Sequence, residues 1–394
     1  DNPLPAVCGR VCPQEAQCEG ACVLNKKGRP IAIGYLERFV ADRELEQAEQ
    51  GSESQPEPTG KSVAVVGSGP AGLACAGDLI RMGHAVTVFE ALHELGGVLT
   101  YGIPAFRLPK AVVDAEIGQL GDLGVRFESD VLVGVSPTVD DLRSREGFDA
   151  VFVGTGAGLP LFPGIDGEDL IGVYSANEFL TRVNLMHAND PESRTPVYDL
   201  DDRSVVVIGG GNTAVDAART ALRLGAAEVT LLYRRSRAEM PARVEEVEHA
   251  EEEGVRFRFL VGPLRFNGQD GWLDGVTIQQ MELGEPDEEG RARPIALEGA
   301  IEDMACEVAI VAIGNRPNPI LTKATPDLDT TSWGTIETDA ASGTTSVPWV
   351  FAGGDVATGG ATVILALAAG RRAAASIDQL WDENDDGINV RADC

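Results

Sequence analysis

The chain contains no apolar run close to the ~20 residues that a helix needs to cross a bilayer. Its first five residues carry neither a basic region nor an apolar core, so no signal peptide is predicted there. We therefore expect a globular, cytoplasmic protein. Hydrophobic residues make up 43% of the 394 residues, which is enough for two or three domains with ample cores.

Basic residues are scarce, and lysine most of all. The sequence holds 32 lysines and arginines, of which only five are lysine, against 62 acidic residues, and its formal net charge is −30. Such a charge argues against binding to nucleic acids or to anionic membranes. Two interpretations of the acidity stay open: an ordinary solvated surface, or adaptation to high salt.

Residues 63–73 read as a short buried strand, a tight glycine turn and the start of a helix. The pattern G-x-G-x-x-G falls on Gly67, Gly69 and Gly72. Gly67 permits the turn, Gly69 lets a pyrophosphate approach the backbone, and Gly72 lets helix and strand pack closely. A second strand, residues 85–89, ends in Glu90, about where a ribose-binding carboxylate belongs. The pattern predicts a dinucleotide-binding site.

Three further segments should reach the same edge of this sheet. The loop 95–110, rich in Gly and Pro, follows the second strand and should run beside the cofactor. Residues 149–153 form another buried strand that ends in a glycine turn, and residues 350–354 form one more. Asp355 follows the latter and could hydrogen-bond a cofactor hydroxyl. A helix that starts near Thr362 could stabilise negative charge on a flavin ring with its N-terminus.

A second strand–turn–helix pattern covers residues 204–219, with the fingerprint G-x-G-x-x-A. The next strand, residues 228–233, ends in Arg234 and Arg235 instead of an acid. An acid there would bond a free ribose 2′-hydroxyl and repel a 2′-phosphate, whereas two arginines do the opposite. The second site is therefore predicted to take NADPH rather than NADH. The alternative is that both arginines are merely surface residues.

Four of the seven cysteines are crowded near the start, with the spacing C-x3-C-x5-C-x3-C: Cys8, Cys12, Cys18 and Cys22. Disulfides are disfavoured in an intracellular nucleotide enzyme, and zinc sites more often show paired C-x2-C motifs. An iron–sulfur cluster needs several converging thiolates and suits this density, but the spacing alone leaves zinc open. Cys75 and Cys306 are predicted to be buried. Residues 33–49 should form a helix with apolar residues available to one face: Leu36, Phe39, Val40 and Leu45.

Together these patterns predict an α/β fold with two Rossmann-like domains, one inserted in the other. A buried strand starting at Cys306 leads to a glycine turn at Gly314, like the turn after residues 149–153. Two such strands, each leaving its domain through a glycine turn, indicate that one domain is inserted in the other. Helices are also expected at 111–123 and 364–380, and short strands around Val125 and Val131. The expected parts are a small helical head at 1–50, a linker at 51–60, a first domain at 61–158 and 315–385, a second domain at 159–314, and a loose tail at 386–394.

Several motifs closely resemble the small (beta) subunit of NADPH-dependent glutamate synthase. They are residues 63–73, 101–110, 209–216, 233–235, 239–241 and 351–356, together with the cysteine head from Asn2 to Glu37. The resemblance runs nearly end to end. The same module is similar to the N-terminal half of dihydropyrimidine dehydrogenase and to a subunit of bifurcating NADH-dependent ferredoxin–NADP reductases.

The resemblance implies a glutathione-reductase-like arrangement with FAD in the first domain, NADPH in the second, and a 4Fe-4S cluster ligated by the four cysteines of the head. Arg107, Thr362 and Val363 would lie at the flavin and form the catalytic set. The expected cofactor-binding residues are Gly67, Gly69, Ala71, Gly72, Glu90, Gly97, Arg107, Val131, Thr155, Gly156, Gly209, Gly211, Asn212, Thr213, Arg234, Arg235, Gly314, Gly354, Asp355, Thr362 and Val363.

One departure from the family concerns the head. In the family, the cysteine domain starts further upstream with another group of four cysteines, and the two groups share two clusters. This chain begins inside that domain, so its ligand set could be incomplete. Glu37 is a candidate oxygen ligand; the alternative is an ordinary helix residue.

The function that the resemblance implies is an NADPH-dependent flavoprotein electron-input module. It would serve the glutamate synthase large subunit, or another electron-accepting subunit, in a hetero-oligomer that makes glutamate from glutamine and 2-oxoglutarate. Neither nucleotide domain contains Cys-x-x-Cys, so dithiol exchange is unsupported, and no glutaminase nucleophile is evident near the N-terminus. The alternatives are a stand-alone NADPH:acceptor oxidoreductase, a pyrimidine-reducing or bifurcating reductase subunit, and a flavin-binding scaffold without electron transfer.

Overall fold

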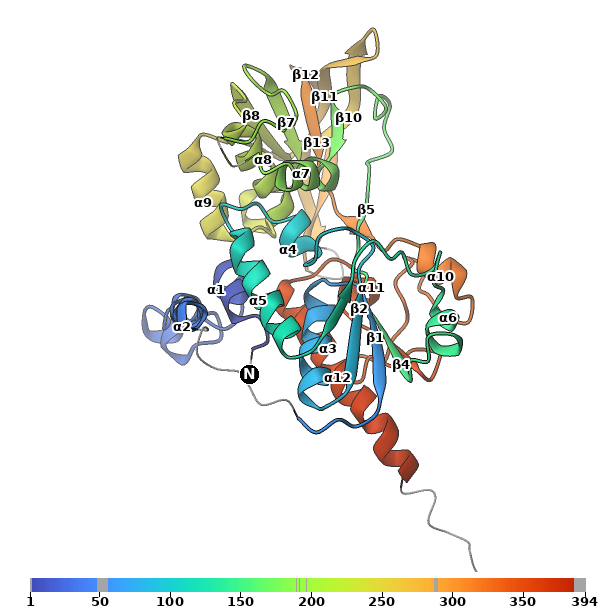
Figure 1. Cartoon of the computed structure of the whole chain (residues 1–394). Helices are drawn as coiled ribbons and strands as arrows, with labels where there is room; N and C mark the ends of the chain where they lie inside the picture. Colours follow the sequence, from blue (N-terminus) through green and yellow to red (C-terminus); the bar gives the residue numbers. More distant parts are fainter. Residues whose placement is uncertain are drawn as a thin grey trace, which may run out of the picture. The chain divides into compact units, whose positions relative to one another are not determined.

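The computed structural model describes residues 2–47, 56–188, 190, 192–195, 197–286 and 290–385, without the side chains of 382–385. The chain forms two compact units (Figure 1). The first unit contains residues 1–100, 107–159 and 315–394, and the second contains residues 101–106 and 160–314. Residues 51–55 of the predicted linker and the whole predicted loose tail lie outside the described residues.

A five-stranded parallel sheet forms the centre of the first unit, in the order β15-β4-β1-β2-β3. Its strands are β1 (Ser62–Val66), β2 (Ala85–Phe89), β3 (Arg126–Glu128), β4 (Ala150–Val153) and β15 (Val350–Ala352). All four residues from Val63 to Val66 are buried, as expected of a strand inside a parallel sheet, which is covered on both faces. The glycine turn therefore starts at the carboxyl end of a central strand.

Helix α3 (Pro70–Arg81) packs against the long helix α12 (Val363–Asp385). Gly370 makes this approach possible, because a Cβ atom there would lie 2.1 Å from the carbonyl oxygen of Ala71. The other helices of this unit are α5 (Lys110–Asp122), α6 (Val139–Ser144), α10 (Ile320–Ala324) and α11 (Asp355–Thr358), and α4 (Val98–Tyr101) reaches its boundary. The close packing fixes the N-termini of α3 and α12 relative to each other.

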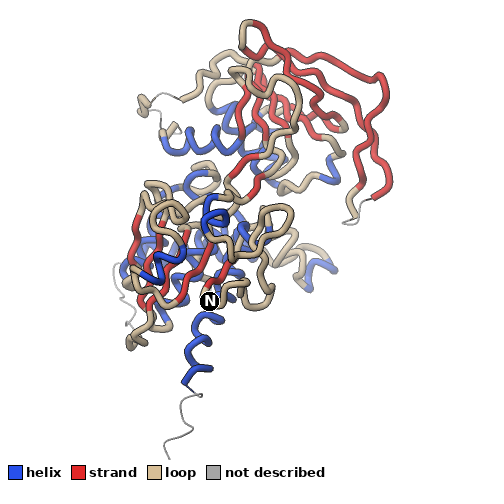
Figure 2. Tube along the Cα trace, turned by 90° about the vertical axis from the view of Figure 1, so that its right-hand side faces the viewer, coloured by secondary structure: helices blue, strands red, loops and turns tan. Residues whose placement is uncertain are grey.

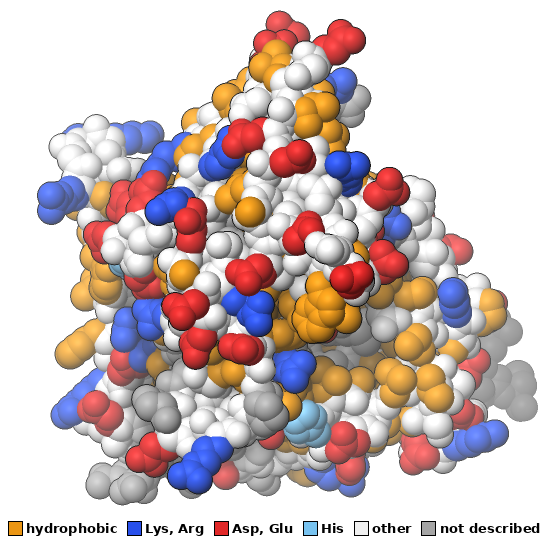
Figure 3. All heavy atoms as spheres, turned by 90° about the horizontal axis from the view of Figure 1, so that it is seen from above, with side chains coloured by type: hydrophobic (Ala, Val, Ile, Leu, Met, Phe, Trp, Pro, Cys, Tyr) orange, Lys and Arg blue, Asp and Glu red, His pale blue; other side chains and the backbone are white. Residues whose placement is uncertain are grey.

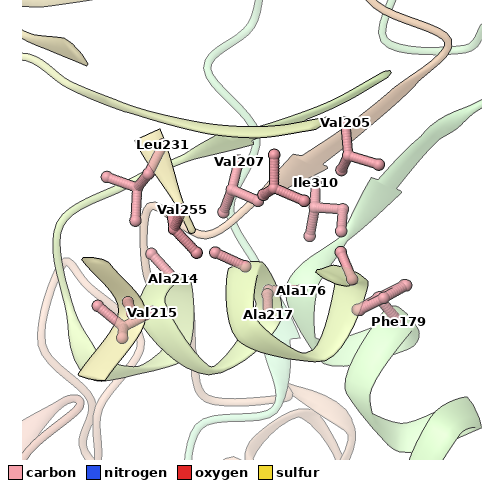
Figure 4. Close-up of a cluster of buried hydrophobic side chains, with 14 of the residues drawn as sticks. Ala176, Phe179, Val205, Val207, Ala214, Val215, Ala217, Leu231, Val255 and Ile310 are labelled. Atoms are coloured by element: carbon pink, nitrogen blue, oxygen red, sulfur yellow. The ribbon is translucent and has the colours of Figure 1, made fainter. Parts of the chain in front are cut away.

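The second unit contains another five-stranded parallel sheet, in the order β6-β13-β7-β8-β9. Its strands are β6 (Val173–Ser175), β7 (Ser204–Ile208), β8 (Glu228–Tyr233), β9 (Arg256–Phe259) and β13 (Val308–Val311). Its helices are α7 (Ala176–Leu185), α8 (Asn212–Arg223), α9 (Val244–Glu253) and the short η3 (Arg237–Glu239). Figure 4 shows Ala214 and Ala217 of α8 beneath Val207 of the sheet. These small residues let the helix lie close to the strands.

A three-stranded antiparallel sheet covers the other face of that parallel sheet. It consists of β10 (Val261–Gln269), β11 (Trp272–Pro286) and β12 (Ala292–Ala305), whose long strands are among the extended red segments of Figure 2. Val276 and Ile278 of β11 share a buried cluster with Val206 and Ile208 of β7. A separate two-stranded sheet joins β5 (Leu159–Pro160) and β14 (Asn315–Arg316). Thus β7, which leads into the second glycine turn, is covered on both faces.

The head consists of α1 (Pro5–Val11), the short η1 (Val23–Lys27) and α2 (Ile33–Gln47). Gly9 lets α1 meet α2, since a Cβ atom there would lie 2.6 Å from the backbone nitrogen of Arg38. On the other side of α1, the backbone N–H of Ala6 donates to Glu116 Oε1 of α5 at 2.6 Å. The head is thereby attached to the first unit.

The structure differs from the sequence expectations at Val131, and in α2 it shows which residues are buried. Val131 lies in a loop, because strand β3 ends at Glu128 and the chain then turns through Asp130, which has φ 60°. In α2, the apolar side chains of Leu36, Phe39 and Val40 are exposed. Its buried residues are instead the small Gly34 and Ala41. Small residues, not large ones, form the packed side of this helix.

Among the described helices, none is both long and apolar enough to span a bilayer. Cys75 and Cys306 are buried, as predicted. Figure 3 shows acidic side chains distributed over the face seen from above, with basic side chains between them.

Candidate nucleotide-binding sites

Two glycines of the first glycine turn are tightly packed against the protein, and the third faces open space. Gly67 has φ 103°, and a Cβ atom there would lie 2.6 Å from the carbonyl oxygen of Gly154. A Cβ atom on Gly72 would lie only 1.9 Å from the carbonyl oxygen of Gly67. A Cβ atom on Gly69, however, would meet nothing within 4 Å. The protein itself excludes a side chain at Gly67 and Gly72, whereas at Gly69 it leaves room for a ligand to approach.

Two other predicted residues converge on this turn. A Cβ atom on Gly97, which has φ 55°, would lie 2.9 Å from the Cα atom of Gly69. A Cβ atom on Gly354, which has φ 77°, would lie 2.9 Å from the Cβ atom of Ala71. Helix α3 begins here without a side-chain cap, so its first backbone N–H groups can face an anion. The open turn fits the pyrophosphate of a dinucleotide.

Glu90 is buried and holds the turn from the neighbouring strand. Its Oε2 atom accepts hydrogen bonds from the N–H of Ser68 at 2.9 Å and from Ser68 Oγ at 2.5 Å, and its Oε1 atom accepts from the N–H of Leu92 at 3.0 Å. Ser68 Oγ also accepts from the N–H of Gly96 at 3.0 Å. A carboxylate has about four lone-pair sites, so Glu90 can still accept from a ribose hydroxyl. Sequence reasoning missed Ser68, whose position inside the fingerprint was the only signal.

The predicted flavin segment lies in the same unit. Asp355 begins α11, and its Oδ1 atom accepts from the N–H of Ala361 at 3.2 Å; burial raises the pKa of this carboxyl above its usual value. Val363 begins α12. Thr362 Oγ1 accepts from Gln17 Nε2 at 3.2 Å. The segment between Cys12 and Cys18 therefore contacts the residues predicted to hold the flavin.

The remaining predicted residues of this unit come from three other segments of the chain. The N–H of Val131 donates to the carbonyl oxygen of Glu90 at 2.9 Å. Thr155 is exposed directly after β4, and Gly156 has φ 69° with nothing within 4 Å of an added Cβ atom. Arg107 is half-buried and is the first residue of this unit after the loop 101–106.

The loop 101–106, predicted to run beside a cofactor, belongs to the second unit. Asn184 Nδ2 donates to the carbonyl oxygen of Tyr101 at 3.0 Å. The guanidinium groups of Arg219 and Arg223 on α8 lie 4.5 and 4.3 Å from the ring centroid of Phe106. These contacts explain why the loop stays with α8, whose N-terminus faces the second glycine turn.

The second glycine turn repeats the design of the first. A Cβ atom on Gly209 would lie 2.3 Å from the carbonyl oxygen of Ala312, and one on Gly210 would lie 2.4 Å from the Tyr233 ring. A Cβ atom on Gly211 would meet nothing within 4 Å. Asn212 begins α8 and its Oδ1 atom accepts from the N–H of Arg243 at 3.0 Å. This turn likewise leaves open the position at which a pyrophosphate would approach.

Two more predicted residues lie beside this turn. Thr213 is exposed in the first turn of α8. Gly314 has φ 119°, and its carbonyl oxygen accepts from the N–H of Leu161 at 3.0 Å. Hydrogen bonds at both ends give the motif 239–241 a structural role. Tyr233 Oη donates to the carbonyl oxygen of Glu239 at 2.8 Å, and the N–H of Ala242 donates to the carbonyl oxygen of Gly210 at 3.1 Å. The motif fixes the chain beside the glycine turn.

The two arginines after β8 have different surroundings. Arg235 is 7% exposed, and its Nε atom donates to the carbonyl oxygen of Ala292 at 2.7 Å. Arg234 is exposed. Partial burial of its guanidinium lowers its pKa, as do the charges of Arg235 and Arg291, while Tyr233 acts in the opposite direction. Sequence reasoning missed Arg291, because it comes from the β11–β12 hairpin, far from the fingerprint.

The four cysteines of the head do not form one closed ligand set. Cys8 and Cys12 are buried. The pKa of Cys8 is raised above its usual value, mainly by a hydrogen bond with Cys12 and, to a smaller extent, by burial. Cys18 is exposed and Cys22 half-buried, and backbone N–H groups, Ile31 first, lower the pKa of Cys22. Glu37 Oε1 accepts from Asn2 Nδ2 at 2.7 Å. Within the described residues, no three Cys, His, Asp or Glu side chains are close enough to hold a metal ion.

Two family models match the chain. One, described as pyridine nucleotide-disulphide oxidoreductase, covers residues 61–370. The other, described as dihydropyrimidine dehydrogenase domain II, 4Fe-4S cluster, covers residues 1–49. The two models thus divide the chain between the cysteine head and the nucleotide-binding part.

The chain is also similar to characterised proteins. The glutamate synthase (NADPH) small chain of Escherichia coli strain K12 is 41% identical over 382 residues, 95% of this chain and 80% of that protein. The NADP(+)-dependent formate dehydrogenase subunit beta of Moorella thermoacetica is 41% identical as well, over 95% of this chain and 54% of that protein.

Solved structures share the fold at low sequence identity. FprA of Mycobacterium tuberculosis in complex with NADPH is 21% identical, with a TM-score of 0.70 over 86% of this chain and 88% of that chain. Thioredoxin reductase of T. acidophilum is 18% identical, with a TM-score of 0.60 over 82% of this chain and 99% of that chain. The predicted fold class, with two Rossmann-like domains, is confirmed.

Proposed function

Since the chain belongs to the glutamate synthase small-chain family of NAD(P)H-dependent FAD oxidoreductases, we propose that it oxidises NADPH bound to its second unit and passes the electrons, through FAD bound to its first unit, to a partner subunit. The observation that carries this proposal is the pair of glycine turns. Each leaves one glycine, Gly69 or Gly211, open to a ligand. One turn is followed by an acid on the neighbouring strand and the other by arginine.

In the first unit, the residues would bind FAD in the following way. The open backbone at Gly69 and the first N–H groups of α3 hold the pyrophosphate, and Glu90 accepts from the adenosine ribose. Asp355 accepts from a ribityl hydroxyl, and Thr362 and Val363 at the start of α12 orient the ring. Bound FAD supplies hydride acceptance and the release of electrons one at a time; the protein supplies position and electrostatic field.

In the second unit, Gly211 and the N-terminus of α8 would hold the pyrophosphate of NADPH. Asn212 and Thr213 begin that helix and line its open end. Arg234 follows β8, where the adenosine ribose belongs in this fold, and its guanidinium would pair with the 2′-phosphate. Glu90 occupies the corresponding place in the first unit, so the two sites would discriminate between a phosphorylated and a free ribose.

The head is the part of the chain that would bind iron. Its match to a 4Fe-4S domain supports iron–sulfur binding by Cys8, Cys12, Cys18 and Cys22. The described side chains do not fit a closed ligand set, and we assign no electron-transfer step to the head. Iron and acid-labile sulfide in protein purified without oxygen would support the cluster, and zinc would argue against it.

For the overall reaction, we propose the electron supply of a glutamate synthase, in which a large subunit performs the glutamine chemistry. The likeness to the E. coli small chain supports this choice. A second candidate is the input subunit of another NADP-linked oxidoreductase. The formate dehydrogenase subunit beta has the same sequence identity to this chain, 41%, as the E. coli small chain.

The test of the proposal has two parts. The purified protein should contain non-covalent FAD and reduce a dye acceptor with NADPH, with a much higher kcat/KM than with NADH. Purification from the native source should then recover the partner, whose sequence distinguishes a glutamate synthase large subunit from a formate dehydrogenase-type partner. Protein that retains no flavin, or that shows no NADPH–dye activity when fully loaded with FAD, would contradict the proposal.

A further inference from the structure

Three arginines from two distant parts of the second unit lie near the end of β8. Arg234 and Arg235 follow this strand directly, whereas Arg291 immediately precedes β12. The connection is a hydrogen bond from Arg235 Nε to the carbonyl oxygen of Ala292, at 2.7 Å. Because Ala292 is the first residue of β12, this bond holds the beginning of that strand, and Arg291 with it, against the end of β8.

The positive charges of Arg235 and Arg291 act on Arg234. Besides partial burial, the charges of Arg235 and Arg291 lower the pKa of Arg234. A concentration of guanidinium groups creates a positive potential that favours the binding of an anion beside them. This concentration is notable in a chain with 62 acidic and 32 basic residues. It lies where a Rossmann fold places the adenosine ribose of its nucleotide.

We propose that Arg291 is a specificity-determining residue that, together with Arg234, binds the adenosine 2′-phosphate of NADPH. The inference rests on the proposed function and adds a residue that lies outside the fingerprint. A phosphate has three acceptor oxygens and matches the planar fork of a guanidinium group. Arg234 approaches it from the end of β8 and Arg291 from the hairpin, so the ligand is held from two elements instead of one.

The experiment compares two probes that differ only in the 2′-phosphate: 2′,5′-ADP and 5′-AMP. Both bind without undergoing reaction, so calorimetry on the FAD-loaded full chain gives their Kd values directly. The variants are Arg291→Gln, Arg291→Lys and Arg234→Gln. Arg258→Gln serves as the matched control, because it also removes one positive charge near β12. Arg258 pairs with the carboxylate of Glu302 through hydrogen bonds of 2.9 and 2.7 Å.

We expect Arg291→Gln to weaken 2′,5′-ADP about tenfold or more and to leave 5′-AMP unchanged. One charge-assisted hydrogen bond contributes ~1.5–3 kcal/mol, and ~1.4 kcal/mol is a factor of ten. Arg291→Lys should keep part of the affinity, since it keeps the charge but not the fork. Arg258→Gln should bind both probes as the wild type does, and all variants should retain FAD.

Two results would overturn the inference and leave the NADPH assignment intact: Arg291→Gln binds 2′,5′-ADP as tightly as the wild type while Arg234→Gln does not, or Arg291→Gln weakens both probes equally. A wild type that binds 2′,5′-ADP no more tightly than 5′-AMP would instead remove the NADPH assignment itself, and the inference with it.

Discussion

At the scale of single residues, the glycines of each turn are required for different reasons. Gly67 and Gly72 are required by the protein, since side chains there would collide with backbone atoms. Gly69 and Gly211 have φ −70° and −89°, which any residue can adopt, and open space in front of them. A ligand that approaches the backbone would give a reason for glycine at these two positions.

We therefore expect Gly69→Ala to fold with nearly wild-type stability but to lose FAD, because the new methyl group occupies the path of the pyrophosphate. Gly211→Ala should keep FAD and lose NADPH affinity. Flavin absorbance after desalting and nucleotide binding by calorimetry measure the two effects. Gly72→Ala is the control: its Cβ atom would lie 1.9 Å from the carbonyl oxygen of Gly67, so it should reduce thermal stability. Full FAD retention in Gly69→Ala would contradict the assignment of the first site.

At the scale of secondary-structure elements, one buried carboxyl group attaches α1 to α5. Glu116 is 4% exposed, and the N–H of Ala6 donates to its Oε1 atom. Burial raises its pKa from 4.5 to about 8, although hydrogen bonds from Ala6 and Val7 and the charge of Arg10 partly oppose the shift. At neutral pH the protonated form of Glu116 is therefore favoured in the folded protein.

This pKa makes the attachment of the head depend on pH. Below pH 4.5 Glu116 is protonated in both the folded and the unfolded state. Between pH 4.5 and about 8 only the folded state keeps the proton, so stability falls as the pH rises through this window. The full shift from 4.5 to about 8 corresponds to roughly 5 kcal/mol.

Glu116→Gln should remove this dependence, because the amide keeps the acceptor for Ala6 and cannot ionise. We expect the thermal midpoint of the variant to equal that of the wild type near pH 5 and to exceed it near pH 9. Thermal unfolding across this range, monitored by circular dichroism, provides the comparison. Parallel pH profiles of the two proteins would show that folding does not shift the pKa of Glu116.

At the scale of the whole molecule, the net charge of −30 opposes compaction. Salt screens this repulsion, since the Debye length falls from ~30 Å at 0.01 M to ~10 Å at 0.1 M. We expect the thermal midpoint to rise from 0.02 to 0.3 M salt. Potassium chloride and potassium thiocyanate should raise it alike, because screening depends on ionic strength and not on the anion. A midpoint that rises in chloride and falls in thiocyanate would show that specific ion effects outweigh self-repulsion.

The sequence by itself determined the elements that depend on local chemistry. Strand β8 runs over Glu228–Tyr233, as predicted from its apolar run, and helix α5 was predicted to within one residue at each end. The glycine fingerprints also located both turns, because the backbone conformation of a tight turn is dictated by the residues in it. Local patterns are reliable wherever neighbouring residues decide the conformation.

Only the tertiary structure decided which distant residues meet. It brought Ser68 to Glu90, Gln17 to Thr362, and Arg291 to the end of β8. It also left the apolar residues of α2 exposed, although a helical period alone predicts a shared face and cannot say what that face meets. These outcomes depend on the packing of elements separated by up to hundreds of residues, and such packing leaves no periodic signal in the sequence.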